Sequence, residues 1–148
     1  MDILFYHLQN ATLEQTLPAL LEKTLQRGWK AVVRVGSDER LKSLDDHLWT
    51  YSEDSFLPHG TVGDAQAAAQ PILLTRGDVR PNGAEVAFAV DGCGLPESDG
   101  WQRVVLIFDG ADPEAVERAR AAWRAASGSG HAATYWRQDA DGRWARQG

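Results

Sequence analysis

The chain has 148 residues, the usual length of one domain. Its 43 % hydrophobic and 24 % charged residues are ordinary for a globular protein, which excludes disorder or low complexity as the main state. A single cysteine, Cys93, excludes an internal disulfide and a cysteine-based zinc site, and indicates a reducing compartment. Because the sequence has neither a signal-peptide pattern nor an apolar run of about 18–20 residues, we expect a cytoplasmic protein without a membrane partner.

The formal net charge of −6 is unevenly distributed. The 31 residues 118–148 carry six arginines against two aspartates, a net charge of +4, so the other 117 residues carry −10. A basic patch on an acidic body suits an acidic peptide better than a long polyanion. Three of the six tryptophans also fall in this segment, and stacking on single-stranded DNA is an alternative. The overall charge opposes that alternative, and we expect no direct nucleic-acid partner.

The chain begins with an alternation of strands and helices. The apolar run 3–7 predicts a buried strand. Thr12 and Gln15 have the spacing of a capping box, and leucines follow at helical spacing up to Gly28. Pro18 lies inside this helix and either kinks it or marks a later start.

The second strand is predicted over the valine-rich run 31–35, and Ser37 begins a helix that reaches about Trp49. Ser, Asp, Pro and Gly residues predict a loop over 50–63. No helical pattern separates the next three strands, which we expect at 71–75, 85–90 and 103–108.

The last part of the chain returns to a helix and then a hairpin. Asp112 and Pro113 are typical of a helix start, and this helix extends to about Ser127. Strands at 132–138 and 144–147 flank a turn. The order predicts an α/β fold: a single three-layer domain over residues 1–148, with a mostly parallel sheet resembling mononucleotide-binding folds and a C-terminal edge hairpin.

A fold of this shape suggests a nucleotide site, but the sequence gives it little support. The loop 8–12 lacks the glycines that admit a pyrophosphate, and there is no Walker lysine. Only free helix amides near Thr12 could hold an anion. Cys93 and His59 could form a nucleophilic pair, although a plain loop thiol is the simpler interpretation.

The other histidines also indicate structure more than chemistry. His7 is expected to be a core or edge histidine of the first strand, and Asp45 and His47 are expected on a solvated helix face. No metal-ligand spacing and no carboxylate pair suited to acid–base catalysis is present in the sequence. We therefore expect no catalytic, cofactor-binding or metal-binding residues and no cofactor.

Two aromatic groups stand out. Trp49 and Phe56 flank or occupy a polar loop, where they either fold back onto the core or meet a partner. Arg120, Trp123 and Arg124 share one helix face. Two guanidiniums beside an indole suit a carboxylate next to an apolar or aromatic group; alternatively, the arginines extend over the helix's own core.

Blocks of sequence along nearly the whole chain resemble the chi subunit of bacterial DNA polymerase III holoenzyme. They are FYHL at 5–8, LDDHLW at 44–49, SFLPHG at 55–60, LIFD at 106–109, RARAAWR within 118–124, GHAATYW at 130–136 and GRW at 142–144. The two blocks between 44 and 60 are the most specific. The blocks occur in the family's order.

This resemblance implies a non-catalytic adaptor of the clamp-loader assembly, with a fold like the mononucleotide-binding domains but no bound nucleotide. One surface of the family binds the acidic, Pro-Phe-ended tail of single-stranded-DNA-binding protein. That surface falls on Arg120, Trp123 and Arg124 here. A basic residue that some relatives carry one turn earlier is Val116 in this chain, which would weaken the grip on the acidic part of the tail.

The resemblance also implies a second surface that docks the psi subunit, which joins chi to the clamp loader. It maps onto Trp49 and Phe56, with Pro58 and His59 shaping the loop. Another clamp-loader partner could take the place of psi. The competing hypothesis is a small nucleotide- or phosphate-binding enzyme on the same fold, which the missing phosphate loop disfavours.

Overall fold

The computed structural model describes residues 2–9, 11–51, 57–96, 100–138, 141 and 143–147. Within them the strands are β1 (Asp2–Leu8), β2 (Ala31–Arg34), β3 (Gly60–Thr61), β4 (Ile72–Thr75), β5 (Val86–Ala89), β6 (Arg103–Asp109), β7 (Ala132–Gln138) and β8 (Trp144–Arg146). The helices are α1 (Leu13–Gln26), α2 (Asp38–Thr50) and α3 (Pro113–Gly128), with a short 3₁₀ helix at Ala67–Ala69.

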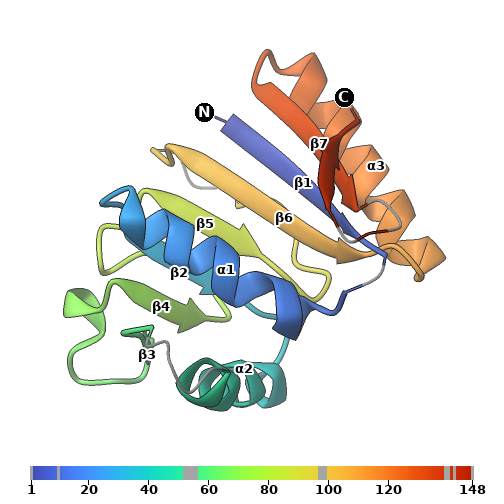
Figure 1. Ribbon diagram of the computed structural model, residues 1–148. Coiled ribbons are helices and arrows are strands. Elements are labelled where there is room, and N and C mark those ends of the chain that lie inside the picture. Colours follow the sequence, from blue (N-terminus) through green and yellow to red (C-terminus); the bar gives the residue numbers. More distant parts are fainter. Residues whose placement is uncertain are drawn as a thin grey trace.

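The strands form one sheet in the order β3-β4-β2-β5-β6-β1-β7-β8 (Figure 1). All neighbouring pairs are parallel except β7 and β8, which form an antiparallel hairpin at the edge. The predicted α/β class, the mostly parallel sheet and the C-terminal edge hairpin are therefore confirmed.

Helices pack on both faces of the sheet, which gives the three layers expected. On one face, α1 and α2 bury a leucine- and valine-rich core that includes Leu17, Leu21, Val33, Leu44, Leu48, Leu74 and Ile107. On the other face, α3 covers β6, β1 and β7 with a smaller core of Ile3, Phe5, Ala89, Leu106, Phe108, Ala115, Ala119 and Ala126. Trp101 and its neighbours close the rest of that second face.

The first helix begins where the capping box predicts. The Thr12 hydroxyl accepts a hydrogen bond from the Gln15 backbone at 3.2 Å, and the Gln15 side chain accepts one from the Thr12 backbone at 2.9 Å. Helix α1 then continues through Pro18 to Gln26, so the later start is wrong. The loop expected over 50–63 contains the two-residue strand β3, which is too short to produce a periodic pattern.

Within the described part of the chain, no helix is both long and apolar enough to cross a bilayer.

Candidate functional site

The structure places the arginines and the tryptophan of α3 as their spacing predicts. Arg120 and Arg124 are exposed and one turn apart, and Trp123 between them is half-buried. Arg124 pairs with Glu117 at 3.6 Å, yet its side chain remains 66 % exposed. No ion pair joins Arg120 to a carboxylate of the described residues. Both guanidiniums are thus accessible to an anionic ligand.

Trp123 is fixed by the sheet beneath it. Its ring meets Phe5 edge-on, with centroids 5.5 Å apart, and Tyr135 edge-on at 5.9 Å. Phe5 in turn stacks on Tyr135. The indole therefore belongs partly to the core of the α3 face and partly to the surface. Its fixed orientation would lower the entropy cost of binding a ligand.

Val116, one turn before Arg120, packs against the α3-face core. It therefore supplies no positive charge at the position where some members of the resembled family carry a basic residue. The positive charge of this surface therefore comes from Arg120 and Arg124 on α3 and from Arg137 on β7.

Strand residues beyond Arg120, Trp123 and Arg124 adjoin this surface. Tyr135 and Arg137 lie on β7, and His7 lies on β1 opposite Arg137 in the register. The Nδ1 atom of His7 is 2.7 Å from the Tyr135 hydroxyl. Only the register of β1 and β7 could have revealed this group, because 128 residues separate His7 from Tyr135 in the sequence.

The second candidate surface centres on Trp49 near the end of α2. This side chain is 49 % exposed, although it is large and apolar. Its ring lies 4.2 Å from the ring of His59, which is buried. Phe56, the other aromatic of this predicted surface, lies outside the described residues. Pro58 is half-buried.

His59 forms a rigid base under Trp49. Its Nε2 atom is 2.9 Å from the carboxylate of Asp45, and its Nδ1 atom is 2.7 Å from the carbonyl oxygen of Leu57. Leu57 itself is buried in the core between the sheet and α2. Asp45 thus contacts His59, so the expected solvated helix face is wrong for this residue. The arrangement presents a large aromatic surface on a fixed support, as interaction hot spots do.

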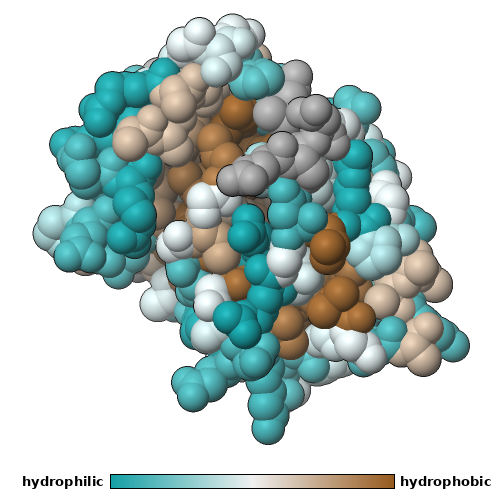
Figure 2. All heavy atoms as spheres, turned by 180° about the vertical axis from the view of Figure 1, so that it is seen from behind, coloured by the Kyte–Doolittle hydropathy of each residue, from teal (hydrophilic) through white to brown (hydrophobic). Residues whose placement is uncertain are grey.

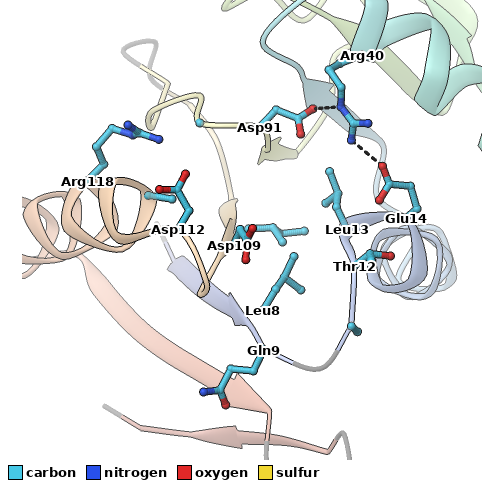
Figure 3. A pocket seen from close by; sticks show the side chains of 14 residues that line it. Leu8, Gln9, Thr12, Leu13, Glu14, Arg40, Asp91, Asp109, Asp112 and Arg118 are labelled. Carbon is cyan, nitrogen blue, oxygen red and sulfur yellow. Dashed lines mark hydrogen bonds and ion pairs between the residues drawn. The ribbon is translucent and has the colours of Figure 1, made fainter.

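A cleft of about 610 Å³ opens at the carboxyl ends of β1 and β6 (Figure 3). The helices that follow these two strands lie on opposite faces of the sheet. Open α/β folds commonly bind ligands in the crevice at such a point. Its ionisable lining consists of Glu14, Arg40, Asp91, Asp109, Asp112 and Arg118. Four carboxylates against two guanidiniums make this cleft unfavourable for a phosphate group.

Arg40 could bind an anion in this cleft, but its guanidinium is already paired with carboxylates. It contacts Glu14 at 2.8 Å and Asp91 at 3.0 Å, as the dashed lines in Figure 3 show. Burial is the largest single influence on Glu14 and opposes its ionisation. The hydrogen bond from Arg40, a backbone hydrogen bond and the charges of Arg40 and His47 together outweigh burial and hold the pKa of Glu14 below the ordinary value. The side chain of Thr12, at the start of α1, caps that helix.

Cys93 and His59, the conceivable nucleophilic pair, belong to different parts of the molecule. Cys93 is half-buried beside the α3-face core, whereas His59 supports Trp49. Burial, reinforced by Asp91, raises the pKa of the Cys93 thiol and is opposed by nearby arginines. A raised thiol pKa reduces the thiolate fraction that a nucleophile needs. Among the described residues, no group of three potential metal ligands is present.

The α3 side is mainly hydrophilic at its outer surface, with hydrophobic atoms in the hollow beside it (Figure 2). An apolar groove of about 190 Å³ lies there, between α3 and the segment that contains Leu95 and Pro96. Arg120, Trp123 and Arg124 do not line this groove, so it is separate from their helix face.

Comparison with known proteins decides the family. The family model described as DNA polymerase III chi subunit, HolC, matches residues 1–134. The chain belongs to the DNA polymerase III chi subunit family. A similar protein is the probable DNA polymerase III subunit chi of Rickettsia prowazekii (strain Madrid E), which is 36 % identical over 103 residues. This match covers 70 % of the present chain and 62 % of the Rickettsia protein, so the chain spans less than two thirds of that relative.

Proposed function

We propose that this chi-family chain is a non-catalytic adaptor of the replicative polymerase. In this role it binds the acidic C-terminal tail of single-stranded-DNA-binding protein on the α3 face and links that protein to the clamp loader. The observation that supports this best is the pair of accessible guanidiniums, Arg120 and Arg124, on either side of the fixed indole of Trp123. We expect the adaptor to act in the cytoplasm, with the replication machinery.

The chemistry of the tail matches the chemistry of this face. A terminal phenylalanine carboxylate would accept paired hydrogen bonds from a guanidinium of Arg120 or Arg124. The phenyl ring would pack against the exposed part of Trp123 and the apolar atoms next to it. Carboxylates upstream in the tail would be attracted by the basic end of the chain, so salt should weaken binding.

Small contacts of this kind usually give micromolar dissociation constants, about −8 kcal/mol. Single-stranded-DNA-binding protein is expected to present several tails at once. Several tails raise the effective concentration at each site, so the assembled partner should bind more tightly than an isolated peptide.

The second surface, around Trp49, is proposed to dock the psi subunit or another clamp-loader partner. Trp49 is exposed and its ring packs on His59, which Asp45 contacts in turn, so the indole has the support that a docking anchor requires. Phe56 and Pro58 are proposed to contribute to the same surface, and buried His59 supports it. The two helices that carry the two surfaces, α2 and α3, lie at different ends of the sheet (Figure 1). Both partners could therefore bind simultaneously.

The alternative, a nucleotide- or phosphate-binding enzyme, would use the cleft at the ends of β1 and β6. The excess of carboxylates there and the pairing of Arg40 disfavour it. Direct binding of single-stranded DNA is disfavoured by the net charge of −6. The adaptor requires no catalytic group and no cofactor.

Calorimetric titration with a short acidic peptide ending in Pro-Phe tests the proposal. We expect micromolar binding that is lost with Arg124→Ala and with a peptide lacking the terminal Phe. Arg27→Ala, at the residue that follows the end of α1, is the matched control and should bind like the parent chain. Absence of binding by the folded parent chain would contradict the proposal.

A further inference from the structure

A group of charged and polar side chains from α3, β1 and β7 lies next to the helix face that carries Trp123. Two arginines from different elements, Arg120 on α3 and Arg137 on β7, act electrostatically on the same two groups, His7 and Tyr135. Both arginines are exposed, and neither forms an ion pair with a carboxylate among the described residues. Asp109 is the carboxylate that also acts on His7, so the two arginines leave an excess of positive charge there, which favours an anion.

The topology brings these side chains together. Strands β1 and β7 are parallel neighbours, with His7 opposite Arg137 and Phe5 opposite Tyr135. Alternation along a strand then puts all four side chains on one face of the sheet, the face that α3 covers. Phe5 and Tyr135 contact Trp123 there. The group therefore lies next to the position beside Trp123 where the terminal residue of the peptide is proposed to bind.

The Tyr135 hydroxyl is the contact that a ligand can share with His7. Its oxygen is 2.7 Å from Nδ1 of His7. When His7 is neutral with its proton on Nε2, the hydroxyl donates to Nδ1. When Nδ1 carries a proton, it donates to the hydroxyl oxygen, which frees the hydroxyl proton for a carboxylate. The direction of one hydrogen bond thus depends on the charge of the imidazole.

The environment keeps the unliganded imidazole neutral. His7 is buried against Phe108 of β6, and Gly110 lies so close that a side-chain carbon there would collide with the ring. Burial, followed by the charges of Arg137 and Arg120, lowers the pKa of His7, and Asp109 acts in the opposite direction. Burial likewise raises the pKa of Tyr135, which therefore stays a hydroxyl. These are the charged and titratable groups that act on His7 from α3, β6 and β7.

We infer that Arg120, Arg137 and the Tyr135 hydroxyl form an anion-binding subsite for an acidic side chain upstream of the tail's terminus, and that His7 takes up one proton from solvent when the subsite is filled. This inference rests on the proposed function and adds to it a specific place for the tail's acidic residues. A bound carboxylate offsets the positive charge of the two arginines. Since that charge helps to keep His7 neutral, its loss favours the protonated imidazole. The added proton then stays on Nδ1 and directs the Tyr135 hydroxyl to the ligand.

The subsite is tested with two peptides, one acidic and ending in Pro-Phe, the other with its upstream acidic residues replaced by asparagines. Arg137→Ala should weaken the acidic peptide about tenfold and leave the asparagine peptide nearly unchanged. Tyr135→Phe keeps the ring and should act in the same direction. Arg118→Ala, on the same helix but lining the cleft, removes an equal charge and serves as the control.

Proton uptake is measured by repeating the titration in two buffers of different ionisation enthalpy. The acidic peptide should bind more tightly as pH falls from about 8 to about 5.5, a range in which its carboxylates stay ionised. His7→Gln retains a polar side chain that does not titrate. This variant should bind the acidic peptide at about pH 8 as tightly as the parent chain does, and its affinity should change less as the pH falls. The asparagine peptide should take up no proton.

The outcomes separate this inference from the proposed function. If Arg124→Ala abolishes binding while Arg137→Ala weakens both peptides equally or neither, the adaptor proposal stands and the subsite is wrong. Equal pH dependence in the parent and in His7→Gln contradicts the proton uptake. If the parent chain binds neither peptide, the proposed function and the subsite are both wrong.

Discussion

The Nε2 atom of His47 lies 2.7 Å from the backbone carbonyl oxygen of Glu14. In an uninterrupted helix, the amide of residue 18 would donate to that carbonyl, but Pro18 has no N–H. A carbonyl only accepts, so Nε2 of His47 is the donor. Helix α2 therefore satisfies an acceptor that a proline leaves open in α1. The expected solvated position of His47 is accordingly wrong, and the bond gives a reason why α1 continues through Pro18.

This relationship predicts a coupling between the two positions. His47→Ala should lower the free energy of unfolding by about 1 kcal/mol because the Glu14 carbonyl loses its donor. In a Pro18→Ala background the restored backbone amide can take over, and the loss should be smaller. Urea unfolding of the parent, the two single variants and the double variant measures the coupling. Equal losses in both backgrounds would rule out the explanation.

The lowered pKa of His7 predicts acid sensitivity of the fold. The unfolded chain binds a proton near pH 6.5, whereas folded His7 binds one only at lower pH. Its contribution to the free energy of unfolding is therefore present above pH 6.5 and is lost as pH falls from there to the folded pKa. The slope is at most about 1.4 kcal/mol per pH unit. Denaturant titrations over this range should show it, and His7→Gln should remove it; an unchanged slope in that variant contradicts the assignment.

Trp49 should depend on Asp45 for its docking role. Asp45→Ala removes the carboxylate that holds His59, and so loosens the base on which the indole rests. We expect the variant to retain less clamp-loader partner in a pull-down than the parent, with a stability loss of about 1 kcal/mol. Trp123→Ala is the matched control and should lose only single-stranded-DNA-binding protein. Full retention of the clamp-loader partner by Asp45→Ala would show that the support is unnecessary.

Cys93 should be slow to react. Its thiol pKa is raised by burial, so the thiolate fraction at neutral pH is small. Mass spectrometry of iodoacetamide labelling should show slower modification in the folded chain than in the chain unfolded by urea. Labelling at the same rate in both states would mean that burial does not protect the thiol.

Local signals in the sequence predict much of this fold. Capping residues such as Thr12 and Ser37 locate the starts of α1 and α2, and apolar runs locate the longer strands. The strand β3 is missed because its two residues carry no periodicity. Pro18 is ambiguous because its missing hydrogen bond is compensated by a residue of another helix.

The candidate sites divide in the same way. Arg120, Trp123 and Arg124 lie on one helix, so their spacing alone places them on one face. His7 and Arg137 come together only through the pairing of the first and seventh strands, which no local pattern specifies. The support of Trp49 by His59 likewise depends on the path of the chain between α2 and β3.

Binding of the tail beside Trp123 is tested most directly by NMR, which follows the indole N–H signals of the six tryptophans during titration with the acidic Pro-Phe peptide. Assignment uses single variants, Trp123→Phe and Trp49→Phe. If the α3 face binds the tail and the Trp49 surface is reserved for another partner, the Trp123 signal shifts with peptide concentration and the Trp49 signal stays in place. A stationary Trp123 signal, or a larger shift at Trp49, would contradict binding of the tail beside Trp123.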